Sequence, residues 1–437
     1  MKSKIFISIL IVTCLAFPGQ GLTKHAEIKI RQQTSSLPQV IIEFAKVSAG
    51  YSHTCTLTGG GGVKCWGENR SGQLGDGTTT QRSTPVDVVS FGSGVVEISA
   101  GGGHTCLLTS GGGVKCWGGN YSGQLGDGTT ENRTTPVDVV GLGSGVVMVV
   151  AGLNHTCALT SRGGVKCWGS NDNGQLGDGT TENRTTPINV VGLGSGVALV
   201  SAGGQHTCTL TSRGRVKCWG ANWYGQIGDS TTANRSTPVN VVSLGSGVTA
   251  VTPGGGHTCA VTSGGGVKCW GSNYAGQLGD GTTENRTMPV DVVGLGVSVS
   301  TIIAGYDHTC ALTIDGGIKC WGNNGYGQLG DGTTENHNLP VDVIDVSGGV
   351  ITISTGGSHT CALVAVDRGP VGRAWCWGWD GYGQLGLGTT TKHIIPVDVF
   401  GLSNNLLVMT GGTSGHSCAI TADGGVKCWG NNVFGKL

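Results

Sequence analysis

A unit of 51 residues recurs along this chain and constrains its fold more than any other feature. A His-Thr-Cys step appears seven times at this spacing, and a related His416-Ser417-Cys418 step follows after 57 residues. Each copy continues into Lys-Cys-Trp-Gly or a close variant, and seven copies then carry Gly-Gln-Leu-Gly or Gly-Gln-Ile-Gly. A fixed period of this length is typical of a propeller or a solenoid, in which each repeat is one supersecondary unit.

Four short segments of each unit have the composition and alternation of β-strands. In the third copy they are residues 155–160, 165–169, 187–191 and 197–202, separated by Gly-rich turns and without a helical period. A closed ring of blades protects the sheet edges that an open array leaves exposed. We therefore predict an all-β protein, a closed β-propeller of four-stranded blades. Seven Gly-Gln-Leu-Gly loops indicate seven blades and eight His-Cys hairpins indicate eight, so both counts stay open here.

The first residues have the plan of a secretory signal peptide. Lys2 and Lys4 precede an apolar run over 5–17, which is shorter than the roughly 20 residues that a transmembrane helix needs. We expect a signal peptide over 1–21, a polar linker over 22–39 and the propeller over 40–437, with its last repeat incomplete. This organisation predicts an exported protein, either secreted or held at the cell surface or in the periplasm, without a transmembrane anchor.

The cysteines indicate intra-blade disulfides. After Cys14 is set aside, 16 remain, two to a unit, and folding a unit about its Gly-rich turn places the two opposite each other on adjacent strands. An even number in an exported chain favours disulfides. A zinc site would need more closely spaced pairs, so we predict no metal and no cofactor. The predicted pairs are Cys55–Cys65, Cys106–Cys116, Cys157–Cys167, Cys208–Cys218, Cys259–Cys269, Cys310–Cys320, Cys361–Cys376 and Cys418–Cys428.

Candidate catalytic residues are all part of the repeat. The eight histidines share one repeat position, which predicts a structural hydrogen bond rather than eight active sites. The Asp of each Gly-Asp-Gly-Thr loop is expected to close its own turn rather than bind calcium. The 26 basic and 26 acidic side chains balance, which argues against a nucleic-acid partner. We therefore do not expect an enzyme.

The repeated motifs resemble the regulator of chromosome condensation repeat family, including its secreted, alpha-tubulin suppressor-like members. Ala-Gly-x-x-His-Thr-Cys-Ala-Leu, Trp-Gly-x-Asn and Gly-Gln-Leu-Gly-Asp-Gly-Thr carry the resemblance, from about residue 40 to the C-terminus. It implies a β-propeller, usually of seven blades. The eukaryotic founders are guanine-nucleotide exchange factors for a Ran-type GTPase on chromatin. The export signal, paired cysteines and neutral charge instead favour the role of other members, which present propeller loops as binding platforms.

Two slots vary between the copies within this chain. The first slot is the pair of residues before each His, and the second lies between Trp-Gly and Gly-Gln-Leu. All seven tyrosines lie in these slots, and Tyr and Trp dominate binding hot spots. If both slots open on one face, their aromatics form a recognition surface; otherwise the Tyr side chains only cover blade ends. The predicted contacts are Trp223, Tyr224, Tyr274, Tyr326, Trp379 and Tyr382.

The seventh hairpin is longer than the others: its cysteines lie 15 positions apart instead of ten, and residues 367–373 occupy the lengthened turn. A longer loop on a rigid scaffold is a common place for function, and it is equally a tolerated insertion. We take Arg368 and Arg373 in this segment as a secondary binding patch.

The sequence thus predicts a monomeric, non-catalytic binding platform whose partner is a protein or a surface glycan. The alternative is a structural or adhesive repeat protein without one discrete ligand, which the near-identity of several units favours. A regulator resembling guanine-nucleotide exchange factors, or a hydrolase with a site at the ring centre, is less favoured.

Overall fold

The computed structural model describes residues 47–431, except 297, 347, 367, 368, 370, 400, 403, 404, 413 and 414. These residues all belong to one compact unit, Phe44–Leu437. They contain 31 strands and no helix, so the described chain also has no helix with the length and apolar character that a membrane crossing requires. The predicted signal peptide, the linker and Arg368 lie outside the described residues and stay predictions.

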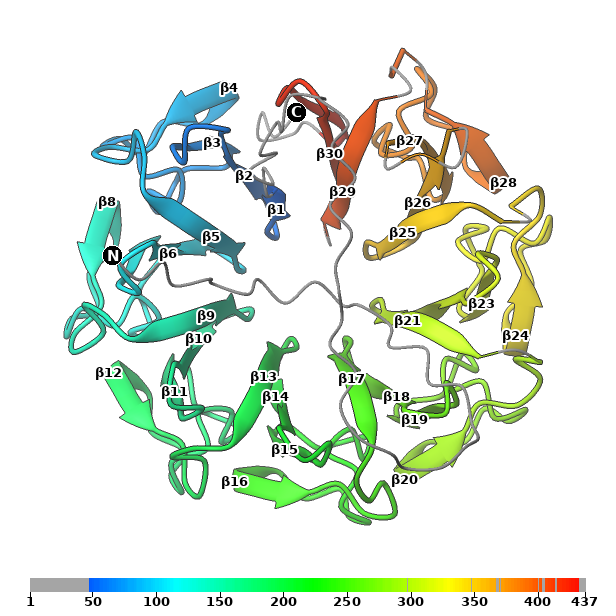
Figure 1. Cartoon of the computed structure of the whole chain (residues 1–437), viewed down its shortest axis with the longest axis horizontal. Helices are drawn as coiled ribbons and strands as arrows, with labels where there is room; N and C mark the ends of the chain where they lie inside the picture. The colour runs from blue at the N-terminus through cyan, green and yellow to red at the C-terminus, as the bar shows by residue number, and fades with distance from the viewer. Residues whose placement is uncertain are drawn as a thin grey trace, which may run out of the picture. The chain divides into compact units, whose positions relative to one another are not determined.

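Seven four-stranded antiparallel blades follow one another along the chain, and each runs from an inner to an outer strand (Figure 1). Blades 1 to 4 consist of β1 (Val47–Ala49), β2 (His53–Leu57), β3 (Val63–Gly67), β4 (Arg82–Asp87); β5 (Val95–Ala100), β6 (His104–Thr109), β7 (Val114–Gly118), β8 (Arg133–Asp138); β9 (Val146–Ala151), β10 (His155–Thr160), β11 (Val165–Gly169), β12 (Arg184–Asn189); and β13 (Val197–Ala202), β14 (His206–Thr211), β15 (Val216–Gly220), β16 (Arg235–Asn240).

Blades 5 to 7 consist of β17 (Val248–Pro253), β18 (His257–Thr262), β19 (Val267–Gly271), β20 (Arg286–Asp291); β21 (Val299–Ala304), β22 (His308–Thr313), β23 (Ile318–Gly322), β24 (His337–Asp342); and β25 (Val350–Thr355), β26 (His359–Ala365), β27 (Gly372–Gly378), β28 (His393–Asp398). An eighth unit, blade 8, has three strands in the described chain: β29 (Leu406–Gly412), β30 (His416–Thr421) and β31 (Val426–Gly430). A single pair, Gly372 with Leu406, joins its sheet to that of blade 7.

Blade 8 lies between blade 7 and blade 1. Its inner strand β29 contacts both β25 and β1, and His416 Nε2 lies 2.8 Å from Thr54 Oγ1 of blade 1. The structure therefore confirms the all-β prediction and the four-stranded blade. The sequence left seven and eight blades open. The structure has seven four-stranded blades, and the eighth His-Cys hairpin forms a further, three-stranded unit at its own position in the ring.

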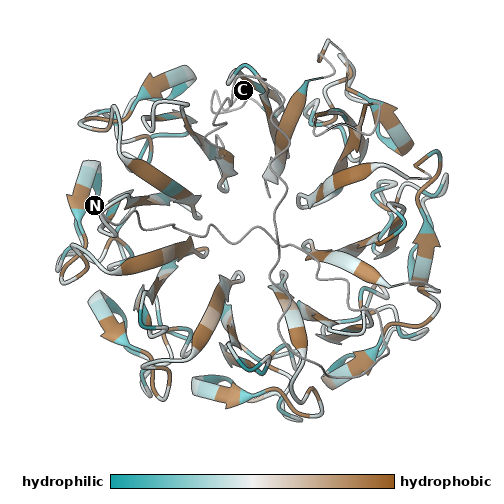
Figure 2. Ribbon diagram, viewed as in Figure 1, coloured by the Kyte–Doolittle hydropathy of each residue, from teal (hydrophilic) through white to brown (hydrophobic). Residues whose placement is uncertain are grey.

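The strand pattern follows from the repeated sequence. In the third strand of each complete blade, Val-Lys-Cys-Trp-Gly or its variant alternates so that Val and Cys point into the packed interior and Lys lies partly exposed. The hairpin before it turns at a glycine such as Gly163, whose φ of 75° is unfavourable for other residues. Figure 2 shows hydrophobic stretches along the inner strands, whereas the outer strands and loops mix hydrophobic and hydrophilic residues.

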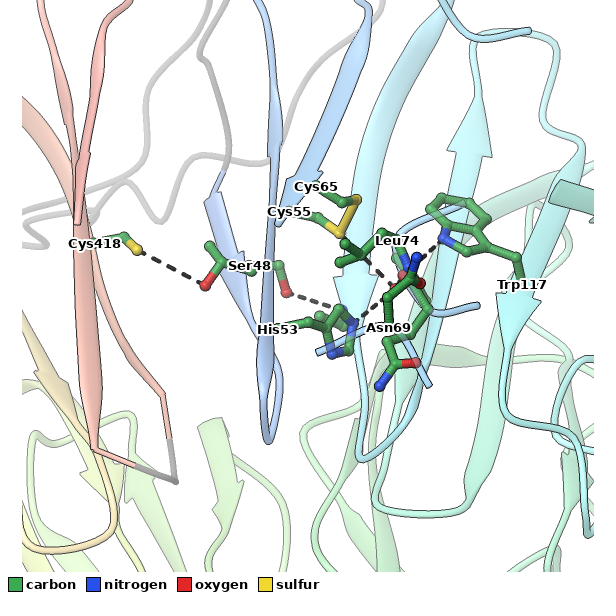
Figure 3. Close-up of a disulfide and its surroundings, with 12 residues drawn as sticks. Ser48, His53, Cys55, Cys65, Asn69, Leu74, Trp117 and Cys418 are labelled. Atoms are coloured by element: carbon green, nitrogen blue, oxygen red, sulfur yellow. Dashed lines mark hydrogen bonds between the residues drawn. A yellow bond between two sulfur atoms is a disulfide. The ribbon is translucent and has the colours of Figure 1, made fainter. Parts of the chain in front are cut away.

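The hydrophobic core lies between neighbouring blades. Between blades 1 and 2 it combines Cys55, Cys65 and Leu74 from the first with Leu107 and Trp117 from the second, all at most 1% exposed. Figure 3 shows this disulfide with Leu74 beside it and Trp117 facing it from the next blade. Each blade thus covers the apolar face of the preceding blade, and the loops at the two ends of the blades remain at the surface.

Candidate binding surface

All eight predicted disulfides are present. Each joins directly opposed residues of the second and third strands of one blade, as Cys157 and Cys167 illustrate. The Cα atoms of each pair lie 4.1–4.2 Å apart, and both cysteines of the first seven pairs are fully buried. The disulfides are therefore internal to the blades, including the Cys361–Cys376 pair in the longer seventh hairpin.

The repeated histidines join each blade to the next through a buried hydrogen bond. His53 Nε2 lies 2.8 Å from Thr105 Oγ1, and this hydroxyl donates its only proton to the carbonyl of Gln73. The hydroxyl must therefore accept from His53, which places the ring proton on Nε2. The same bond joins His104 to Thr156, His155 to Thr207, His206 to Thr258, His257 to Thr309, His308 to Thr360, His359 to Ser417 and His416 to Thr54.

Burial keeps the six histidines of blades 2 to 7 neutral. Desolvation lowers the pKa of His155 and His206 to about 4, and that of His257 to about 3 with a further contribution from neighbouring histidines. The rings lie directly beneath a glycine three residues earlier, as at Gly152, where an added Cβ would lie 2.4 Å from His155 Cε1. These observations bear out the predicted structural role of the histidines.

The repeated tryptophans also join neighbouring blades. Trp117 Nε1 donates to the carbonyl of Gln73 at 2.9 Å, and the equivalent bond recurs up to Trp377 in blade 7. In blade 8 the Nε1 of Trp429 is buried without such a partner in the described chain. From blade 2 to blade 7, the Trp rings therefore combine apolar packing with one directed bond to the preceding blade.

The repeated Asp closes its own loop, as predicted. Asp76 accepts from the amide and hydroxyl of Thr78, and Arg82 Nε donates to its other oxygen at 2.8 Å. Asn69 Nδ2 donates to Asp76 and to two loop carbonyls. Burial alone would raise the pKa of Asp76, but the bonds from Thr78 and Arg82 outweigh it and hold that pKa below its usual value. No acidic or sulfur- and histidine-rich cluster suited to a metal ion occurs in the described residues.

The seventh loop departs from this arrangement. Asp380 replaces the repeated Asn and Leu387 replaces the repeated Asp. The Asp380 side chain is fully buried and accepts from the amide of Leu385, and burial raises its pKa. Because a carboxylate cannot donate, the loop carbonyls that Asn69 Nδ2 reaches in blade 1 have no equivalent donor in blade 7.

The two variable slots of this chain open on the same face. We call it the slot face; the opposite ends of the strands carry the turns between second and third strands and form the hairpin face. Neighbouring slots touch across blade boundaries: Asn173 donates to Gln205 at 3.3 Å, and a Cβ on Gly256 would lie 3.2 Å from the ring of Tyr224. The predicted recognition surface required both slots to open on one face, and the structure meets this condition.

The predicted aromatic contacts lie on blades 4 to 7 of the slot face, and we call them the aromatic arc. Trp379, half-buried, lies between Tyr326 and Tyr382, with ring-centroid distances of 5.7 and 5.0 Å. Tyr326 and Tyr382 are 45% and 46% exposed, so this cluster is accessible. The other members of the arc are Trp223, Tyr224 and Tyr274, which are 54%, 41% and 58% exposed.

The structure also adds two residues that were not among the predicted contacts. The hydroxyl of Tyr274 bonds to the Asp307 carboxylate in the first slot of blade 6, and burial together with this bond raises the pKa of Tyr274. Tyr306, beside Asp307, is 61% exposed and its ring approaches Gly255. The slot position of Tyr306 was the available signal, but only the folded ring places it next to Tyr274.

Arg373 lies on the other face. It is at the start of β27, at the hairpin face, with Nη1 3.9 Å from Asp398 Oδ2. It therefore does not share a surface with the aromatic arc, and its role in binding stays a prediction.

Comparison with known proteins shows similarity throughout the described ring. An RCC1-like domain matches residues 192–437, and regulator of chromosome condensation (RCC1) repeats match segments between residues 44 and 210. The ultraviolet-B receptor UVR8 of Arabidopsis thaliana is 34% identical over 364 residues, which cover 82% of each chain. Human E3 ubiquitin-protein ligase HERC2 is 32% identical over 84% of this chain, which spans only 8% of that protein.

Two solved structures share the fold. Human WBSCR16 superimposes with a TM-score of 0.65 at 23% identity and covers 85% of this chain and 99% of its own. Prp20p of Saccharomyces cerevisiae superimposes with a TM-score of 0.66 at 21% identity, covering 89% and 93%.

Proposed function

Because this chain belongs to the regulator of chromosome condensation (RCC1) repeat family, whose propellers serve as protein-binding scaffolds, we propose that it is an exported, non-catalytic platform that binds a protein through the aromatic arc. The observation that carries the proposal is the accessible cluster of Trp379 with Tyr326 and Tyr382 on one face of a rigid ring. Aromatic side chains of this kind supply much of the binding energy of protein interfaces.

The geometry of the cluster favours a protein over a glycan. The Tyr326 ring is tilted by 43° to Trp379, and Tyr382 meets it edge-on at 72°. The rings therefore form an uneven ridge rather than a flat platform for a sugar ring. Such a ridge suits insertion between the side chains of a partner protein. Prp20p, which shares the fold, is described as binding Gsp1p and histones, so a propeller of this shape can hold protein partners.

Export is supported by the cysteines. Eight disulfides in one chain are typical of an oxidising compartment, such as the cell exterior, the periplasm or the secretory pathway. The sequence of residues 1–21 is in keeping with that location. We propose that the ring meets its partner there.

Affinity capture from the native surroundings tests the proposed function. The bait is the oxidised chain, compared with a variant in which Tyr326, Trp379 and Tyr382 are changed to Ala. A matched control changes Tyr51 and Tyr121, which lie on the same face in blades 1 and 2. We expect one protein to be captured by the wild type and the control and to bind the arc variant about tenfold or more weakly, as measured with purified components.

Two results would contradict this function. Equal binding by the arc variant and the wild type would remove the arc from recognition and favour a structural or adhesive repeat protein. Capture that survives protease treatment of the surroundings but is lost after glycosidase treatment would identify a glycan instead of a protein.

A further inference from the structure

The hairpin face carries a concentration of positive charge on blades 3 and 4. In blades 1, 2, 5 and 6 the Lys of the third strand pairs with an Asp of the outer strand, as Lys64 does with Asp87 at 2.6 Å. Asn replaces this Asp in blades 3 and 4 only. Lys166 therefore donates to the neutral Asn189 at 2.8 Å, and Lys217 is paired in register with Asn240. Within the described residues, neither of these two lysines forms an ion pair with a carboxylate, so their positive charges stay uncompensated.

The turns of the same two blades add three arginines. Blades 2 and 5 turn through Ser-Gly-Gly-Gly, whereas blade 3 has Ser-Arg-Gly-Gly and blade 4 has Ser-Arg-Gly-Arg. The arginines are Arg162, Arg213 and Arg215, and all three are exposed. The chain segments that form this end of blades 3 and 4, residues 157–166, 189–197, 208–217 and 240–248, contain no Asp or Glu. A chain of zero net charge thus holds five uncompensated cations in one place, which we call the basic patch.

A hollow in the surface lies within the basic patch. It has a volume of about 400 Å³ and is lined by Arg162, Lys166 and Asn189 together with Thr160 and Val165. The equivalent hollow of blade 6, of about 490 Å³, is lined instead by Asp315, Asp342 and Asp345 around Lys319. The fold therefore repeats the hollow, and the side chains give it opposite charge in the two blades.

We infer that the basic patch binds an extended acidic polysaccharide on the face opposite the aromatic arc. An arginine side chain donates two parallel hydrogen bonds to the oxygens of a carboxylate or a similar oxyanion such as sulfate. Because Arg162 and Arg213 occupy the same position in neighbouring blades, the charge forms a row over two blades, which suits a polymer better than a single small ion. The choice of a polysaccharide rests on the proposed export, since acidic polysaccharides are polyanions of the cell exterior. The aromatic arc plays no part in this binding.

Heparin oligosaccharides of defined length are the probe, and binding to the oxidised full chain is measured by titration at several salt concentrations. The main variant combines Arg162→Gly, Arg213→Gly and Arg215→Gly, which gives both turns the sequence of blades 2 and 5. We expect it to bind about tenfold or more weakly and to depend less on salt. A second variant, Asn189→Asp with Asn240→Asp, restores the carboxylates of the other blades and is expected to weaken binding severalfold without changing the arginines.

The matched control is the double variant Arg70→Ser with Lys392→Thr, which removes two cations from the slot face. Its heparin affinity is compared with that of the double variant Arg162→Gly with Arg213→Gly, which removes two cations from the basic patch. The inference requires the control to bind like the wild type. It is overturned if the wild type does not bind heparin at low salt, or if the two charge-matched variants bind alike. Tighter binding of polyglutamate or double-stranded DNA through the same arginines would overturn the assignment to a polysaccharide. All these results leave the test of the aromatic arc unaffected.

Discussion

The interior between blades and the ends of the blades differ in how strictly the repeat is kept. Between blades, the cysteine pair, the His, the Trp and the glycine beneath the His recur almost without exception. Nearly all of them are buried, and the His and Trp side chains hydrogen-bond to the neighbouring blade. At the ends, the same 51-residue unit carries Tyr, Trp, Arg, Asp or Gly at equivalent positions. The side chains on the two faces therefore vary between blades without being required for the ring to fold.

This contrast separates stability from recognition within one chain. A buried position that contacts the next blade must suit every copy, because each blade meets its neighbour in the same way. An exposed slot has no such constraint, so blades 4 to 7 can gather aromatics and blades 3 and 4 can gather cations. Four measurements of stability test the interior half of this contrast, in order of decreasing change in the free energy of unfolding.

Acid should destabilise the ring more than any single substitution. Six histidines, among them His104 with a pKa of about 3 and His155 with about 4, stay neutral when folded, whereas an unfolded His titrates near 6.5. The unfolded chain therefore binds more protons, and stability falls as the pH drops below about 6.5, by up to ~1.4 kcal/mol per pH unit for each histidine. Urea unfolding of the oxidised chain between pH 7 and 4.5 measures this loss.

Carboxylates cannot account for a loss in that range. The pKa values of Asp76 and Asp127 are lowered by their hydrogen bonds, so their contribution disappears only below about pH 3.8. A free energy of unfolding that stays constant between pH 6.5 and 4.5 would contradict the prediction, because it would mean that folding does not require these histidines to be neutral.

Removal of one disulfide should cost about 3 kcal/mol. Cys157→Ala with Cys167→Ala opens a loop of about 11 residues, and the chain-entropy contribution of such a bridge is about 2.5–3 kcal/mol. The measurement is the urea midpoint, with Ser161→Ala in the exposed turn of the same hairpin as the control. A loss below about 1 kcal/mol would mean that the blade interface alone fixes this hairpin.

The glycine beneath each histidine should tolerate no side chain. Gly152→Ala places a Cβ 2.4 Å from His155 Cε1 and 3.1 Å from the carbonyl oxygen of Gly203, so we expect a loss of about 2–3 kcal/mol. Gly204→Ala is the matched control, because a Cβ there meets nothing within 4 Å. Similar melting temperatures for the two variants would contradict the close packing of ring and backbone.

Blade 7 offers the smallest effect and the opposite sign. Asp380→Asn replaces a buried carboxyl group of raised pKa by the amide that the first six blades have, and supplies a donor for the loop carbonyls. We expect a gain of about 1 kcal/mol at pH 7, measured by thermal unfolding. The reverse change in blade 6, Asn324→Asp, should destabilise by more than this, because it also places two carboxylates in contact: Asn324 Nδ2 donates to Asp331 at 3.0 Å. If Asp380→Asn is destabilising, the carboxylate has a role that the loop geometry does not reveal.

Much of the interior was predictable because its signals are local or strictly periodic. The ten-residue spacing of Cys157 and Cys167 about a Gly-rich turn places them on opposed strands, and His at eight equivalent positions indicated a structural bond. The partner of that bond, the Thr of the next blade, was not predicted, because it lies 52 residues away and is reached only when neighbouring blades pack.

The surface was predictable only in part. The slots of Tyr274 and Trp379 were identified from variation between copies, but their neighbours Asp307 and Tyr326 belong to other blades. The position of Arg373 on the opposite face follows from the strand direction in the folded blade. The basic patch is not evident from the sequence because equivalent cations lie 51 residues apart and acidic residues elsewhere cancel them in the net charge.

The blade follows from the chain alone, since period, turns and cysteine spacing act within about fifty residues. The contact of blade 8 with blade 1, the slots that touch and the charges that share a face follow only from the folded ring. These relations depend on the packing angle between neighbouring blades. That angle is set by the whole buried interface of Trp, Leu, Val and disulfide side chains, and no local pattern in the chain encodes it.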